Sequence, residues 1–134
     1  MPTIEHFSHA DGLAIFRPTG KHTLVSVVDA VKNAIARCRT LQLSRLLVVT
    51  HDVTGVSPPT LIDRFLAVED WAHASKSQVV VGMAISVEHI HPQKFGVKVA
   101  KSFGLTANVF DTEAEALAWL SSYDNDGQQK QKRS

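Results

Sequence analysis

The sequence predicts an α/β fold, with four strand–helix units around a mostly parallel, mixed sheet of four to five strands. Short apolar runs rich in β-branched residues alternate along the chain with longer segments whose apolar residues recur at helical spacing. This alternation favours parallel strands joined by helices that cover the faces of the sheet. With 134 residues, of which 44% are hydrophobic and 20% charged, the chain suits one ordinary globular domain.

The N-terminal half supplies two of these units. Residues 13–18 predict a strand, and residues 23–38 predict a helix with an apolar stripe along one side. The continuous apolar run over residues 45–50 is typical of a buried strand, and residues 61–74 again have helical periodicity. We also expect an extra N-terminal strand within residues 2–7.

The C-terminal half supplies the other two units. Residues 79–85 predict a second buried strand, followed by a helix over residues 92–104. Residues 107–110 predict a short strand, and residues 112–120 predict the last helix. Because strands and helices alternate to the end, we expect all four units to join one sheet.

Three helix ends carry recognisable capping residues. Thr23 precedes the first helix as a candidate N-cap, and Thr112 with Glu115 has the spacing of a capping box. Gly104 is a candidate C-cap because glycine adopts the left-handed conformation that often ends a helix.

We assign residues 1–122 to one domain and residues 123–134 to a polar tail. From Asp124 onward the tail has no apolar residue, so burial cannot offset the entropy of ordering it, and we expect disorder. The net charge of the whole chain is +1, and the tail accounts for it. A domain without excess charge lacks the basic surface that general nucleic-acid binding needs.

The composition also bears on the compartment. The longest apolar run, VVVGMAI, is far shorter than the roughly 20 residues of a membrane-spanning helix. The N-terminus has no basic segment followed by an apolar stretch, as a signal peptide would. The single cysteine, Cys38, excludes an internal disulfide and fits a reducing compartment. We therefore expect a cytoplasmic protein without a membrane span.

The stretch HDVTGVSPPT, residues 51–60, lies where a strand gives way to a helix, at the edge where open α/β sheets bind ligands. Gly55 permits a tight turn with positive φ. Ser57 is a candidate N-cap for helix 61–74, although Pro59 disfavours helical geometry at Pro58 and so delays the helix. Three roles remain open for this stretch: a structural turn and cap, a loop for a partner or a modification, and a ligand site.

Two stretches resemble a known family. LLVVTHDVTGVS, residues 46–57, resembles the STAS pattern of an apolar strand followed by Asp-Leu-Ser-Gly-Val. VFDTEAEALAWL, residues 109–120, resembles the family's aromatic strand end and terminal helix. The chain is thus similar to the SpoIIAA-like, or STAS/SEC14-like, small bacterial proteins. The matching positions are Asp52, Val53, Thr54, Gly55, Val56, Phe110, Glu115, Ala116, Trp119 and Leu120.

The resemblance implies a STAS-type fold over residues 1–122, with one departure. STAS antagonists of anti-sigma factors carry a phosphorylatable serine at the start of the second helix. Here Thr60 and Leu61 fall where Asp and that serine would stand. Ser57, Thr54 and Thr60 are nearby hydroxyl residues, but none occupies the matching position.

No pattern in the sequence predicts catalysis. His51, Asp52 and Ser57 suggest a triad, but the nucleophile-elbow motif is absent, and adjacent strand residues point to opposite faces. Cys38 falls on the apolar stripe of its helix, so we expect a buried, inert thiol. We therefore assign no catalytic residue and no cofactor.

The seven histidines raise the question of a metal. His51, His89 and His91 fall near the carboxyl ends of neighbouring strands, so they form a candidate ligand or metal edge. The alternative is that they are ordinary surface and loop residues. No Cys-x-x-Cys or His-Glu-x-x-His motif favours a metal.

Our leading hypothesis is a non-enzymatic, STAS-like protein-interaction or regulatory module, linked to phosphorylation if one of the nearby hydroxyls is modified. Its expected site is the loop with Asp52, Thr54, Gly55, Ser57 and Thr60. The alternative is a small-ligand or lipid-binding domain of the SEC14-like kind, with a cavity between helices 61–74 and 92–104. A protein partner is expected, and the composition also permits a homodimer.

Overall fold

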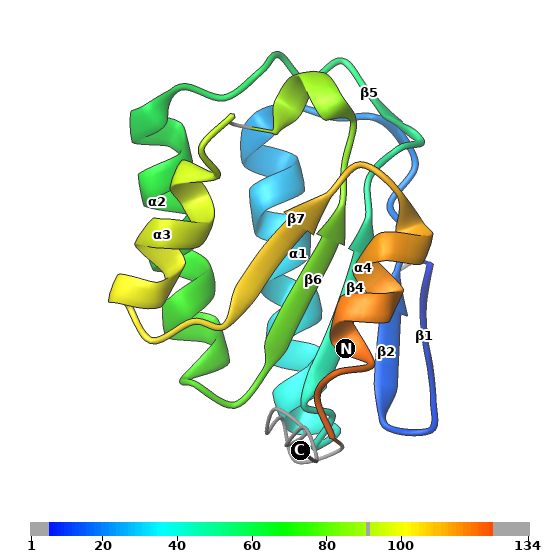
Figure 1. Cartoon of the computed structure of the whole chain (residues 1–134). Coiled ribbons are helices and arrows are strands. Elements are labelled where there is room, and N and C mark those ends of the chain that lie inside the picture. The colour runs from blue at the N-terminus through cyan, green and yellow to red at the C-terminus, as the bar shows by residue number, and fades with distance from the viewer. Residues whose placement is uncertain (1–5, 91, 125–134) are drawn as a thin grey trace.

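A mixed five-stranded sheet forms the centre of the molecule, as predicted (Figure 1). The computed structural model describes residues 6–90 and 92–124. The strand order is β1-β2-β4-β6-β7, in which β1 runs antiparallel to β2 and the other neighbours are parallel. The strands are β1 (Phe7–Ala10), β2 (Leu13–Phe16), β4 (Arg45–Val49), β6 (Val80–Ala84) and β7 (Ala107–Phe110).

Helices cover both faces of this sheet unequally. Three helices lie on one face: α1 (Leu24–Thr40), α2 (Leu61–Ser75) and α3 (Phe95–Ser102) (Figure 1). The opposite face carries α4 (Glu113–Leu120), which packs on β4, β6 and β7. None of the described helices is long and apolar enough to cross a membrane.

Side-chain alternation along the strands builds a separate core on each face. In β6, Val81 and Met83 face the three-helix side, whereas Val80 and Ala84 face α4. Gly82 also faces α4, and a Cβ there would lie 2.9 Å from Cγ of Leu120. Close packing of α4 on the middle of the sheet therefore requires a glycine in this strand.

The outermost of the three helices is α2. Its backbone packs against α1 and α3, and it has no comparable contact with any strand in the described part of the chain. Val68 and Ala72 join the buried cluster below it. Thus α2 bridges α1 and α3, and a space remains between α2 and the sheet.

The prediction that Ser57 caps α2 is wrong. Thr60 is the N-cap: its side chain accepts a hydrogen bond from the backbone N–H of Asp63, and Asp63 accepts one from the backbone N–H of Thr60. The two prolines explain the shift, because Pro59 disfavours helical geometry at Pro58 and the helix begins only after both. The N-caps predicted at Thr23 and Thr112 are confirmed. At Thr112 the capping box is not closed, because the Glu115 side chain accepts from the Thr112 hydroxyl rather than from its backbone N–H.

The helix predicted over residues 92–104 is shorter than expected. It begins after Lys94, whose left-handed backbone, with φ of 50°, cannot continue a helix. Lys94 Nζ donates to Oδ1 of Asn108 at 2.9 Å and lies over the ring of Phe110. Gly104, directly after the C-cap residue Phe103, has the left-handed backbone predicted for the helix end, with φ of 79°.

The ends of the chain also differ from expectation. The N-terminal strand predicted in residues 2–7 falls largely outside the described residues, and β1 instead runs from Phe7. Tyr123, which we placed in the tail, packs its ring edge-to-face on Trp119 with centroids 5.1 Å apart. Residues 125–134 of the predicted tail lie outside the described part of the chain.

Candidate functional site

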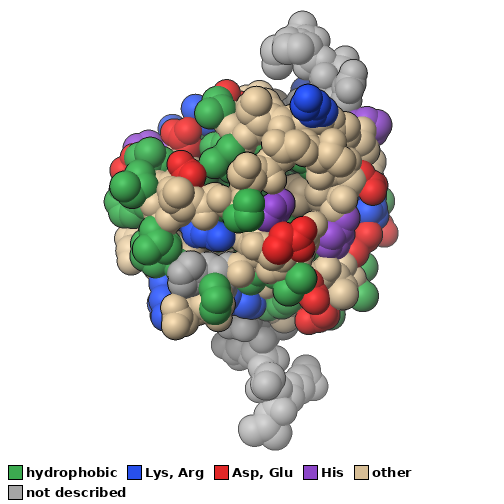
Figure 2. All heavy atoms as spheres, turned by 90° about the horizontal axis from the view of Figure 1, so that it is seen from above, with side chains coloured by type: hydrophobic (Ala, Val, Ile, Leu, Met, Phe, Trp, Pro, Cys, Tyr) green, Lys and Arg blue, Asp and Glu red, His purple; other side chains and the backbone are tan. Residues whose placement is uncertain are grey.

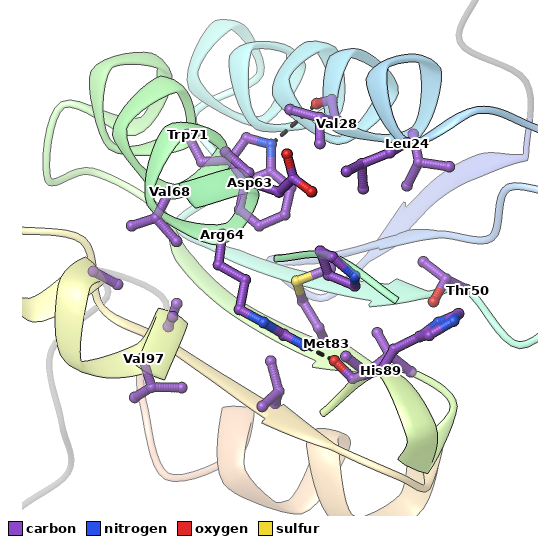
Figure 3. A pocket seen from close by; sticks show the side chains of 18 of the residues that line it. Leu24, Val28, Thr50, Asp63, Arg64, Val68, Trp71, Met83, His89 and Val97 are labelled. Carbon is purple, nitrogen blue, oxygen red and sulfur yellow. Dashed lines mark hydrogen bonds between the residues drawn. The ribbon is translucent and has the colours of Figure 1, made fainter. Parts of the chain in front are cut away.

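A cavity of about 150 Å³ lies between the three helices and the sheet (Figure 3). Its walls come from α1, α2 and α3, and its floor comes from β6 and β7. Most of the lining side chains are apolar. They include Leu24, Val27, Val28, Val68, Trp71, Met83, Ile85, Val97, Ala107 and Val109. A cavity was expected between α2 and α3, and this one also reaches α1.

The loop from Thr50 to Thr60 forms the upper rim of the cavity. Every third residue, Thr50, Val53, Val56 and Pro59, lines it. The residues between them point outward and are exposed, so one residue in three along the loop faces the cavity. The stretch that looked like a turn is therefore also part of the cavity wall.

A short parallel pairing holds this loop in place. β5 (Val53–Thr54) pairs with β3 (Gly20–Lys21). The backbone N–H of His22 donates to the carbonyl of Thr54 at 2.9 Å. Gly55 follows with φ of 85°, and a Cβ there would lie 3.1 Å from the carbonyl oxygen of His22. The predicted tight turn at Gly55 is confirmed, and both its conformation and its close neighbour favour glycine.

Trp71 links two walls of the cavity. Its indole Nε1–H donates to the carbonyl of Val28 in α1 at 3.0 Å, and its ring lines the cavity (Figure 3). The side chain is half-buried. Its hydrogen bond ties α2 to α1 beside the cavity.

Arg64 is the cationic residue of the lining. Its Nη1 donates to the carbonyl of His89 at 2.8 Å, joining α2 to the short helix η1 (Val87–His89). Its Nε is buried and has no hydrogen-bond partner among the residues that the structure describes. Burial lowers the pKa of the guanidinium, because an apolar environment disfavours the charged form. The cavity thus combines a large apolar surface with one partly buried positive charge.

The predicted loop residues lie together at the carboxyl end of the sheet. Asp52, Thr54 and Ser57 are exposed, whereas the side chain of Thr60 is engaged in the cap of α2. The side chains of His51, Asp52 and Ser57 form no hydrogen bond within the described residues, so they do not assemble a triad. Figure 2 shows histidine, acidic and basic side chains interspersed over this end of the molecule.

The histidine edge is only partly visible. His51 is exposed on the rim, and His89 lines the cavity (Figure 3). His91 lies outside the described residues. Among the residues that the structure describes, no group of three or more His, Cys, Asp or Glu side chains is placed to hold a metal ion. The three-histidine site stays a prediction.

The same end of the sheet carries an ion pair that the sequence did not suggest. Arg17, just after β2, donates from Nη1 to Oε2 of Glu113 at 2.8 Å and also bonds Oε1 through Nη2. This contact with the arginine lowers the pKa of the Glu113 carboxyl. The pair ties the first turn of α4 to the end of β2.

Cys38 is fully buried in the core, as predicted. Burial raises the pKa of its thiol to about 12, because the apolar surroundings disfavour the thiolate. A thiol in this environment is not a nucleophile at neutral pH.

Sequence reasoning missed the residues that make the cavity. An apolar stripe on the first helix, which includes Leu24, Val27 and Val28, predicts that this side packs in the core. The stripe does not reveal whether other side chains fill the space in front of it or leave a cavity. Arg64 lies within the predicted helix 61–74, where its position does not distinguish it from a surface arginine. The period-three pattern of Thr50, Val53, Val56 and Pro59 was the one available signal for the rim.

Comparisons of the chain with protein-family models, with curated proteins and with solved structures found no match. The geometry of the described residues is therefore the ground for assigning a function.

Proposed function

We propose that the chain is a non-enzymatic module that binds a small, mainly apolar ligand in the cavity beneath the Thr50–Thr60 loop. The observation that carries this proposal is the cavity itself, about 150 Å³ in volume. Its lining is mostly apolar, so an apolar ligand that covered these side chains would remove them from water and be stabilised by it. A dry apolar cavity of about 150 Å³ holds a benzene-sized molecule.

The position of the cavity supports the same proposal. Thr50 and Ile85, which directly follow β4 and β6, line it at the carboxyl end of the parallel strands, where α/β sheets bind ligands. The loop above it is anchored on one side by β3 and on the other by the capped start of α2. A ligand in the cavity contacts Val53, Val56 and Pro59 from below, and so couples occupancy to the outer surface of the loop.

A titration of the full chain with benzene tests the proposal. The chain has two tryptophans. Trp71 lines the cavity, whereas Trp119 lies on the α4 face of the sheet. In a two-dimensional ¹H–¹⁵N NMR spectrum, we expect the indole N–H signal of Trp71 to shift saturably while that of Trp119 stays in place. Unchanged signals at benzene saturation would contradict the proposal.

A regulatory role through the loop is the second candidate, and exposed apolar residues favour it. Leu61 and Ile62, which directly follow the loop, are 51% and 72% exposed. They follow the exposed loop residues Thr54 and Ser57 in the sequence. A STAS-like module that meets a protein partner here, and is modulated by phosphorylation, is the form of this candidate that the sequence resemblance implies.

A native mass spectrum separates the two candidates. The protein is purified gently from its own cells with phosphatase inhibitors present. A phosphate-sized increment that maps to Thr54 or Ser57 supports the regulatory role. A retained small molecule supports ligand binding. If substituting Asp52, Thr54 and Ser57 with alanine leaves every native partner bound, the regulatory loop is ruled out.

A further inference from the structure

The guanidinium of Arg64 forms fewer hydrogen bonds than a partly buried arginine usually does. An arginine has five N–H donors, and this one makes a single hydrogen bond within the described residues, from Nη1 to the carbonyl of His89. Its Nε is buried and has no partner among the described residues. A buried donor without an acceptor destabilises the fold, so an acceptor that reached this Nε would stabilise it.

No carboxylate of the described chain pairs with this charge. The adjacent Asp63 lines the same cavity, but its Oδ2 accepts from the backbone N–H of Thr60 at 3.0 Å. Figure 3 shows the side chain of Asp63 on the α1 side of the cavity, whereas Arg64 runs toward His89. Arg17, by contrast, has a bidentate partner in Glu113. A partly buried, unpaired cation is costly, and an anion relieves that cost.

We propose that the cavity takes a small organic monocarboxylate, with its carboxylate on the guanidinium of Arg64 and its compact apolar body against Trp71 and Met83. This rests on the proposed function, because it assigns the class of ligand to the same cavity. A planar carboxylate matches the fork of the guanidinium, which favours it over a neutral polar group.

A phosphate ester fits this site less well. Anion sites at helix N-termini rely on free backbone N–H groups. At the start of α2, the capping box already engages the backbone N–H groups of Thr60 and Asp63, so fewer donors are left for a phosphate. One arginine beside a benzene-sized apolar space suits a single negative charge on a compact hydrophobic body.

The test compares benzoate with benzamide, its neutral analogue of nearly equal shape. Both are titrated into the full wild-type chain, and the indole N–H signal of Trp71 reports occupancy. We expect benzoate to bind roughly tenfold more tightly or better, because hydrogen bonds to charged groups are the stronger kind. Arg64→Gln should remove this preference while benzamide still binds.

Two controls separate the outcomes. Ala67→Leu fills the cavity and should abolish binding of both probes. If benzoate still binds this variant, its binding is adventitious and at the surface, and the inference is overturned. Equal affinity of wild type for benzoate and benzamide also overturns it, and needs no variant that must fold. If benzene binds but benzoate does not, the proposed function stands and the carboxylate assignment fails. If benzene does not bind either, both fail.

Discussion

At the scale of single residues, Thr60 and Ser57 show what decides where a helix begins. Both are good N-cap residues, and both precede the apolar positions of α2. Only Thr60 follows the two prolines, and it has Asp63 three positions later to complete a capping box. A sequence can offer several caps, and the backbone restriction imposed by proline selects among them.

Alanine substitutions at these two positions test the assignment. Thr60→Ala should lower the free energy of unfolding by about 1 kcal/mol, because the backbone N–H of Asp63 loses its acceptor. Ser57→Ala should leave it nearly unchanged, because that side chain is exposed and forms no hydrogen bond within the described residues. Urea denaturation measures both. A larger loss for Ser57→Ala would return the cap to the position first predicted.

A pair of glycines gives a second residue-scale prediction. Gly82→Ala should destabilise the fold by about 1–3 kcal/mol, because its Cβ meets Leu120 Cγ at 2.9 Å. At Gly96 in α3, the nearest neighbour of a new Cβ is Cγ2 of Val68, at 3.8 Å. Gly96→Ala should therefore leave stability unchanged or raise it by up to about 1 kcal/mol, since alanine favours helices. Equal effects of the two substitutions in urea would show that α4 does not approach β6 so closely.

At the scale of elements, periodicity predicted the strands and helices well because the core imposes it. Val81 and Met83 alternate with Val80 and Ala84 because both faces of β6 are covered. The residues at which elements begin and end were harder to predict. α3 begins late because Lys94 adopts a left-handed backbone to reach Asn108, a tertiary contact that no local pattern reveals.

The ion pair between Arg17 and Glu113, which ties β2 to α4, leads to a prediction about the pH dependence of stability. In the folded state Arg17 lowers the pKa of Glu113, so folding favours the carboxylate and the pair adds stability above the ordinary pKa of 4.5. That contribution is lost as pH falls through the lowered pKa. We expect Glu113→Gln to be less stable than wild type near neutral pH, with the difference shrinking below about pH 4.5.

A double-mutant cycle checks that the partner is Arg17. Thermal unfolding across the pH range should show that Arg17→Gln added to Glu113→Gln costs little more than either change alone. Because both side chains are partly exposed, the effect is modest and weakens with salt. A stability difference that persists at strongly acid pH, or fully additive losses, would contradict the assignment.

At the scale of the whole molecule, the cavity follows from how three helices share one face of the sheet. α1 and α3 take the places next to the strands, and α2 bridges them from outside. The Trp71–Val28 hydrogen bond ties α2 to α1 beside the space below α2, and the Thr50–Thr60 loop forms its rim. The apolar stripes predict that these helices cover the sheet, but a volume left between packed elements depends on their relative placement in three dimensions.

Two alanines of α2 test whether that space is real. Ala67 and Ala72 are both nearly buried, at 8% and 7% exposure, but only Ala67 lines the cavity. Ala67→Leu should keep or raise the free energy of unfolding, because the added atoms enter open space. Ala72→Leu should lower it by about 1–3 kcal/mol through overpacking. Similar losses in urea for the two variants would mean that the interior is uniformly filled.

A crystal of the full chain pressurised with xenon tests directly whether the cavity beneath α2 accepts a small apolar molecule. Xenon enters dry apolar cavities of about 150 Å³. We predict a xenon peak bounded by Val28, Trp71 and Met83, which vanishes in Ala67→Leu. Side chains that fill this space in the crystal, with no xenon between α2 and the sheet, would contradict the account.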